Sequence, residues 1–407
     1  MRLGPVLVAE GWVLMVGLAF SPGFVSTDTL QQFAQGKSGQ YSNLHPPLYS
    51  WLLGATGSIG WLFWGQLVLL AGGLLAVGLH ASSGWRRMVW LVGALSIPPV
   101  WALAPTLWKD VLFVGVGLWA VVALLHRRHS VAAAALLVLP CLRHNALFAV
   151  VPLALLILLR VEGTRARLIW AAVFVVVLFA APRAIERLTG ATDVWPGGQL
   201  YVFALAAMER EGAVLPAEVR QAGSRYDAHA VTPLIGVPDG ERYSVDYLSA
   251  NRAVVEAAAY GAIADDPLSF LRHRWEVSRH VFGIDGEPVC EPFHMAIDSN
   301  PWGWAFIHQA PVRSWLLDVG ATLANSVLFR GWWWLSLAAL LLIIGLVRKD
   351  PDSVAVAASA VSYSLSFTLA APTCDFRYQF WVVVAVLVGL VIARGRTSRG
   401  GVTPAQR

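Results

Sequence analysis

Residues 60–80 decide the fold, and they read GWLFWGQLVLLAGGLLAVGLH. The run contains no Asp, Glu, Lys or Arg, and it is long enough to cross a bilayer core, which takes about 20 apolar residues per helix. On either side of it lie further apolar segments, near 5–24, 88–105, 110–125, 131–142, 146–160, 167–182, 331–347, 353–371 and 379–393. We therefore predict an all-α polytopic membrane protein with about ten transmembrane helices.

The composition of the whole chain agrees with a membrane location. Of its 407 residues, 57% are hydrophobic and 14% are charged, against about 25% charged residues in a typical soluble protein. Too few polar side chains are present to cover a soluble fold of this size, so a soluble enzyme, a disordered chain and a coiled coil are excluded. An outer-membrane barrel is excluded as well, because its strands alternate polar and apolar residues in runs of about 10.

Arginine is concentrated in alternate short connections. The arginine-rich connections are 83–87, 126–129, 160–167, 348–350 and the tail after residue 394. The other connections hold single basic residues, Lys37, Lys109, Arg143 and Arg377. By the positive-inside rule, the first set is cytoplasmic and the second is extracytoplasmic. We predict a multi-pass protein of the cell (inner) membrane with both termini inside and an uncleaved first segment.

This topology divides the chain into four parts. Residues 1–182 form an N-terminal transmembrane module of about seven helices, and 183–330 form an extracytoplasmic helical loop region. Residues 331–393 contain the C-terminal transmembrane helices, and 394–407 are a disordered cytoplasmic tail. The 183–330 region is net acidic, whereas the basic excess is scattered over short loops. That distribution argues against a nucleic-acid partner, which requires a clustered basic surface.

Ionisable and polar residues gather in four loops on the predicted outer face: Asp28, His45, Lys109, Asp110, Arg143, His144, Asn145, Asp375, Arg377 and Tyr378. Each has an ordinary explanation by itself, as a helix cap, a local ion pair or a side chain that reaches the lipid headgroups. Together they place acids and bases on one side of the membrane. Such a set suits a site that binds a phosphate and supplies a carboxylate base.

Two short patterns resemble a known family. Asp28 follows the first apolar segment, and His45-Pro46-Pro47-Leu48 then precedes Trp51. This opening resembles the GT-C superfamily of membrane glycosyltransferases, and within it the protein-mannosyltransferase and aminoarabinose-transferase branch. Arg377-Tyr378 before the last apolar segment is similar to a recurrent ending in that group. The resemblance covers the first ~110 residues best and says almost nothing about 190–310.

The resemblance implies transfer of a sugar from a polyprenyl-phosphate donor to a lipid, glycan or protein acceptor at the extracytoplasmic face. It implies that Asp28 is the base in an inverting reaction. We assign Lys109, Arg143 and Arg377 to the carrier phosphate and His45 to the phosphate or acceptor. The remaining substrate-binding candidates are Asp110, Asn145, Asp375 and Tyr378.

The chain departs from the family in the first-loop acids that could bind a metal. Many members carry paired acids in the first loop, whereas Thr29 follows Asp28 here. We therefore expect metal-independent transfer, with a divalent metal as the alternative. His273, Glu276 and His280 also share a predicted helix, but their spacing matches no standard zinc motif. We interpret that segment as an amphipathic surface helix.

Two other functions fit a protein of this class. A transporter or flippase would show inverted repeats and helices broken at mid-membrane, and the sequence shows neither. A glycan polymerase or ligase would also use outer-face arginines with a lipid-linked sugar.

The three cysteines, Cys141, Cys290 and Cys374, have no metal-binding spacing. We predict that they are unpaired, with a Cys290–Cys374 disulfide as the alternative.

Overall fold

The computed structural model describes residues 3–216, 219, 249–284, 286, 291–307 and 310–397, and within these ranges it is helical with three isolated β-bridges. The helices up to residue 125 are α1 (Leu3–Phe20), α2 (Thr27–Ser38), α3 (Leu48–Thr56), α4 (Ile59–Ala81), α5 (Trp85–Ser96), α6 (Pro98–Leu103) and α7 (Lys109–Leu125). Those up to residue 210 are α8 (His129–Val138), η1 (Leu139–Cys141), η2 (His144–Ala146), α9 (Leu147–Arg160), α10 (Thr164–Thr189) and α11 (Gly198–Arg210). The remainder are α13 (Arg252–Asp265), α14 (Pro267–Phe282), α15 (Pro311–Leu323), η4 (Val327–Phe329), α16 (Gly331–Val347), α17 (Pro351–Ala370), η5 (Phe376–Gln379) and α18 (Phe380–Thr397).

Five helical segments within the described ranges are long and apolar enough to cross a membrane: α1, α4, α10, α17 and Phe376–Ala393. Shorter apolar helices occupy His129–Cys141, His144–Arg160 and Gly331–Val347. The predicted 88–105 segment is divided into α5 and α6, because Ile97 before Pro98 is extended and Pro98 then begins a new helix. The all-helical class and the membrane character are therefore confirmed, with five candidate crossings where the sequence suggested about ten.

The predicted first outer loop contains two helices, α2 and α3. Ser26 forms a capping box with Thr29 at the start of α2, and Gly39 in the left-handed conformation ends it. The two helices approach closely, because a Cβ on Gly36 would lie 2.3 Å from the Ser50 carbonyl oxygen. Capping and glycine packing thus form two short helices in this largely polar segment, for which the sequence analysis expected only an outer loop.

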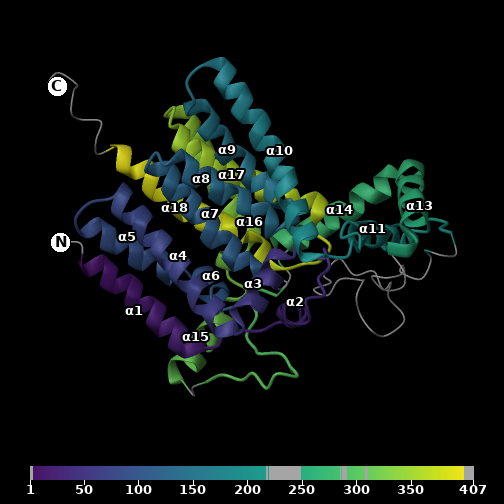
Figure 1. Ribbon diagram of the computed structural model, residues 1–407, viewed down its shortest axis with the longest axis horizontal. Coiled ribbons are helices and arrows are strands. Elements are labelled where there is room, and N and C mark those ends of the chain that lie inside the picture. The colour runs from purple at the N-terminus through teal and green to yellow at the C-terminus, as the bar shows by residue number, and fades with distance from the viewer. Residues whose placement is uncertain are drawn as a thin grey trace.

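The core of the bundle is built around α7, which is buried along most of its length. It packs against α4, α8 and α18, while α17 packs against α9, α16 and α18 (Figure 1). Gly117 of α7 lets the Trp381 ring approach, since a Cβ there would lie 2.9 Å from it. Packing on all sides fixes the first turn of α7, which carries Lys109 and Asp110.

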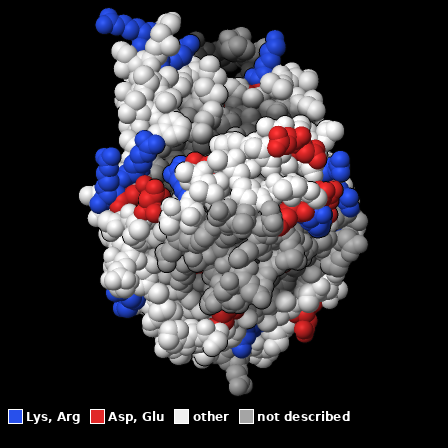
Figure 2. Space-filling view, turned by 90° about the vertical axis from the view of Figure 1, so that its right-hand side faces the viewer, with Lys and Arg blue, Asp and Glu red and all other residues white. Residues whose placement is uncertain are grey.

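Helices α11, α13 and α14 form a lobe at one end of the bundle, at the right of Figure 1. Seen from that side, acidic and basic side chains form a band across the middle of the molecule (Figure 2). Above the band the surface is largely uncharged, and Lys and Arg appear again at the upper edge (Figure 2).

Helix α10 contributes an apolar segment of which only 6% is buried, as expected for a helix facing lipid.

Candidate functional site

A cavity of about 820 Å³ lies where the predicted outer-face loops meet. Its walls come from α2, the loop before α3, the first turn of α7, the η1–η2 turn, the ends of α10 and α17, and the segment before α18. The structure brings all nine predicted site residues to this cavity: Asp28, His45, Lys109, Asp110, Arg143, Asn145, Asp375, Arg377 and Tyr378. Their position on one cavity is observed, whereas their roles remain predictions.

The segment that leads to Asp28 is held on both sides by backbone hydrogen bonds. Phe24 N donates to Pro105 O, and Leu107 N donates to Phe24 O. On the other side Val25 N donates to Ala296 O. Asp28 then falls in the first turn of α2, where the helix dipole favours a carboxylate. The Asp28 side chain is 30% exposed and therefore accessible from the cavity.

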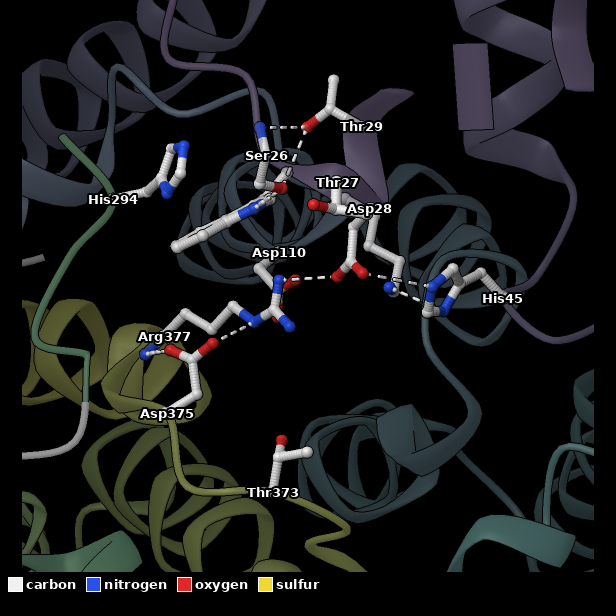
Figure 3. Close-up of polar contacts among 12 residues, drawn as sticks. Ser26, Thr27, Asp28, Thr29, His45, Asp110, His294, Thr373, Asp375 and Arg377 are labelled. Carbon is white, nitrogen blue, oxygen red and sulfur yellow. Dashed lines mark hydrogen bonds and ion pairs between the residues drawn. The ribbon is translucent and has the colours of Figure 1, made fainter. Parts of the chain in front are cut away.

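Arg377 joins the first loop to the last one. Its Nη1 donates to Asp28 Oδ2 at 2.8 Å, and its Nε lies 2.7 Å from Asp375 Oδ2 (Figure 3). The guanidinium also lies 4.6 Å from the centre of the Trp108 ring. One arginine thus fixes two carboxylates that are far apart in the sequence.

Asp110 and Arg143 form a second, buried ion pair. Arg143 Nε also donates to Asn145 Oδ1 at 3.2 Å, and Asn145 Nδ2 donates to Ser366 Oγ at 3.1 Å. The Arg143 guanidinium lies 5.4 Å from the centre of the Tyr378 ring. These contacts lock Arg143 between α7, the η1–η2 turn and α17, so its charge has a fixed position at the cavity wall.

His45 and Lys109 form the third polar group. Lys109 Nζ lies 3.0 Å from His45 Nδ1, and His45 Nε2 lies 3.8 Å from Asp28 Oδ1. Among the described residues, Lys109 forms no ion pair with a carboxylate, unlike Arg143 and Arg377. Of the three cations Lys109, Arg143 and Arg377, Lys109 is therefore the one that no described carboxylate neutralises by direct contact.

The charge states of these groups follow from burial and from their neighbours. Burial acts to raise the pKa of Asp28, but Arg377, His45 and Lys109 outweigh it and hold that pKa well below its usual value. Burial lowers the pKa of Lys109 to about 7, with Arg377 and Arg143 acting in the same direction. Burial, with help from Lys109, also lowers the pKa of His45. Asp28 is therefore ionised at neutral pH, and Lys109 titrates there.

Four ionisable residues on the cavity lie outside the four outer loops of the sequence analysis: Glu186, Glu291, His294 and Asp298. His294 Nδ1 lies 3.3 Å from Glu291 Oε1, and His294 Nε2 lies 3.4 Å from Asp298 Oδ1. Burial would lower the pKa of His294, but these two carboxylates raise it above its ordinary value. No local pattern marks the His294 group, because its segment reaches the cavity through tertiary contacts with Val25 and Phe376.

The described part of the chain contains no candidate metal-binding group, and this includes the helix that carries His273, Glu276 and His280. No group of three or more His, Cys, Asp or Glu side chains in these ranges is arranged to hold a metal ion. His273 and His280 are buried, whereas Glu276 pairs with Arg210 on the surface. The three residues therefore do not face a common point.

The cysteine prediction requires a correction. Cys141 is free and buried, as predicted. Cys374, however, is disulfide-bonded, where we predicted an unpaired thiol. Cys290 lies outside the described residues. Spacing alone could not reveal the bond, because a disulfide depends on the distance between the two cysteines in the folded chain.

Comparison with known proteins adds no relative to this picture. No protein-family model, no curated protein and no solved structure matches the chain. The functional argument therefore rests on the residues and geometry of the cavity.

Proposed function

We propose that this protein is a membrane glycosyltransferase of the GT-C type. It transfers a sugar from a polyprenyl-phosphate donor to a lipid, glycan or protein acceptor at the extracytoplasmic face of the cell membrane. The observation that carries the proposal is the convergence of ionisable residues from four distant loops on one cavity. Its volume of about 820 Å³ falls in the range of about 300–1,000 Å³ that is usual for small-molecule sites.

The cavity offers groups suited to a phosphate leaving group. Breaking the bond between the anomeric carbon and the phosphate oxygen leaves negative charge on the carrier. Fixed cations stabilise that charge without reorganising. Arg143 and Arg377 are held in place by their carboxylate partners, and Lys109 retains a charge that no described carboxylate offsets in a direct ion pair. Lys109 is therefore the principal phosphate ligand in this proposal.

Asp28 supplies the base. It is ionised at neutral pH, exposed to the cavity, and oriented by Arg377 on one side with His45 beyond it (Figure 3). An acceptor hydroxyl that enters the cavity loses its proton to Asp28 as the acceptor oxygen bonds to the anomeric carbon. A direct displacement of this kind inverts the anomeric configuration. Asp110 and Asp375 are engaged with arginines, which favours a positioning role for them over a nucleophilic one.

The full topology belongs to this proposal as well. We propose about ten crossings, made by the five candidate spans together with the shorter apolar helices and the α5–α6 and α7 segments. Both termini then lie in the cytoplasm and the cavity faces outward, in accordance with the distribution of arginine in the short loops. The lobe formed by α11, α13 and α14 lies on the same outer side and borders the cavity through the start of α11.

The test is a transfer assay in proteoliposomes with radiolabelled polyprenyl-phosphate sugars and a panel of lipid and glycan acceptors. We expect wild type to consume a donor and Asp28→Asn to lose transfer by roughly 100-fold or more, as for a general base, while it still binds the donor. Asp318→Asn is the matched control, because Asp318 is exposed on α15 and does not line the cavity.

Each other result assigns a different function. Movement of intact lipid-linked sugar across the bilayer without consumption would replace the proposal by a flippase. Lengthening of a lipid-linked glycan without use of a monosaccharide donor would indicate a polymerase or ligase. Equal transfer by Asp28→Asn and wild type would remove Asp28 from the role of base.

A further inference from the structure

Helix α14 exposes an apolar stripe on the lobe at the end of the bundle. Leu268, Leu271 and Trp275 are 64%, 59% and 60% exposed. Their spacing of three and four residues places them along one side of the helix. We call these three residues the α14 stripe. Large apolar side chains this exposed in a row indicate a partner or an apolar surrounding.

The position of α14 is fixed by Arg274. Its guanidinium donates to the carbonyl oxygens of Thr368 at 2.8 Å, Ala371 at 3.2 Å and Phe367 at 3.3 Å. These carbonyls belong to the last turn and the C-cap of α17, a candidate membrane span, where a helix leaves carbonyl oxygens without intrahelical donors. Phe367 O also accepts from the Ala371 N–H. Because Arg274 binds the end of the span, α14 lies at the level where α17 leaves the membrane.

The stripe lies on one flank of α14, to the side of Arg274. A helix turns by about 100° per residue, so Leu271 and Trp275 lie about 60° and about 100° around the helix from Arg274. Arg272 and Glu276 lie farther round, each about 160° from Arg274. The exposed surface is therefore apolar on the flank next to α17 and charged on the flank away from it.

The surface of α17 continues this apolar flank. Leu365 and Leu369, in the last turns of α17, are 45% and 67% exposed. Exposed leucines at the end of a candidate span face lipid. Both helices thus expose large apolar side chains within a few residues of the contacts made by Arg274.

We propose that the α14 stripe is a membrane-docking surface and that α14 lies in the interface of the outer leaflet. The partner is the phospholipid bilayer, with the two leucines and the tryptophan at the boundary between headgroups and acyl chains. Tryptophan favours this depth because its ring has an apolar body and a polar N–H. The charged flank with Arg272 and Glu276 faces the headgroups and water. This inference rests on the proposed topology, which puts the lobe on the outer side, and does not require the proposed transfer reaction.

Docking of α14 also sets the depth of the cavity. Phe367, whose carbonyl binds Arg274, lines the cavity together with Ala370 at the end of α17. An interfacial α14 therefore holds the cavity at the level of the lipid phosphates. A ligand with a phosphate in the headgroup region and a chain in the membrane could reach it without leaving the leaflet.

Spin-label accessibility in the full-length protein tests this inference. On a Cys141→Ser background with the Cys374 disulfide kept oxidised, a nitroxide is attached to Leu271→Cys, and in a separate protein to Glu276→Cys as the control on the charged flank. Both are reconstituted in phosphatidylcholine–phosphatidylglycerol vesicles. Collision rates are then measured with oxygen, which partitions into lipid, and with a water-soluble nickel chelate.

We expect the label at position 271 to collide more with oxygen and several-fold less with the nickel chelate than the label at 276. The corresponding depth should be about 5–10 Å below the headgroups, as for an interfacial helix. Equal nickel accessibility at the two positions would overturn the inference. Spin–spin broadening at 271 would overturn it too, because it would show a second copy of the chain on the stripe. Leu268→Cys repeats the measurement if Leu271→Cys does not fold.

Discussion

Two buried arginine–aspartate pairs lie at opposite ends of α17, and one of them lines the cavity whereas the other does not. Arg143 and Asp110 are 9% and 4% exposed, and Arg160 and Asp352 are 10% and 5% exposed. Asp352 is in the first turn of α17, whereas Phe367 near its end lines the cavity. The two points are roughly 22 Å apart along the helix.

The difference between the pairs lies in their surroundings. The first pair is accompanied on the cavity by Lys109, Asp28 and Arg377. Arg160 instead donates to Leu124 O, so it joins α7, α9 and α17 on the side away from the cavity. A buried ion pair is therefore a poor marker of a functional site by itself, and a cavity with additional uncompensated charge is the better marker.

Arg143→Ala should have the largest effect. It leaves Asp110 buried without its partner and removes a fixed cation from the cavity. We expect a loss of stability of about 3–5 kcal/mol and a decrease in transfer per folded molecule of about 100-fold or more. Thermal unfolding in detergent and the transfer assay measure the two effects. If transfer per folded molecule stays within twofold of wild type, the Arg143–Asp110 pair only stabilises the fold, as we expect of the Arg160–Asp352 pair.

Arg160→Ala should separate stability from activity. It removes the cation that forms an ion pair with the buried Asp352, and it should also destabilise the protein by about 3–5 kcal/mol. Transfer per folded molecule should remain that of wild type at a temperature where the variant is folded, because Arg160 does not line the cavity. A lower transfer rate in the fully folded variant would contradict the contrast between the two ends.

The disulfide at Cys374 should stabilise only the end of the bundle that contains the cavity. It directly precedes Asp375, so the bond restrains the segment that carries Asp375 and Arg377. Reduction, or Cys374→Ser, should cost about 2–4 kcal/mol of stability and reduce transfer less than Arg143→Ala does. Unfolding temperature and transfer with and without dithiothreitol test this, with Cys141→Ser as the control for thiol chemistry elsewhere. Insensitivity of both quantities to the reductant would refute it.

The pH dependence of donor binding should give the smallest effect. The pKa of Lys109, lowered by burial to about 7, means that its charge is lost as the pH rises through that value. Donor affinity should therefore fall severalfold between about pH 7 and about pH 8.5. Asp28 causes no opposing change between about pH 5 and about pH 7, because its pKa is held below the usual value of about 4.

The matched variant for this measurement is Lys109→Arg. Arginine retains its charge over the whole range, so the decline in affinity should disappear while binding near neutral pH persists. An identical pH profile for Lys109→Arg and wild type would show that another group causes the dependence.

Much of the fold follows from local sequence. The apolar segments, the arginine-rich connections and the division of 88–105 at Pro98 and Pro99 are all encoded within about 20 residues. Helices α2 and α3 escaped prediction because their stability comes from capping at Ser26 and from the close contact of Gly36 with Gly54. Such contacts depend on how two segments pack, and hydropathy does not report them.

The membrane character of the chain, and the outer-loop residues that are candidates for a site, can be read from the amino-acid sequence alone. Both depend on residue type and position along the chain, because the cost of placing charge in lipid is local. The partners of these residues became visible in the folded chain: Arg377 with Asp28, Arg143 with Asp110, Lys109 beside His45, and Arg274 on the end of α17. Asp28 and Arg377 are separated by 349 residues, and which distant charges meet is set by helix packing.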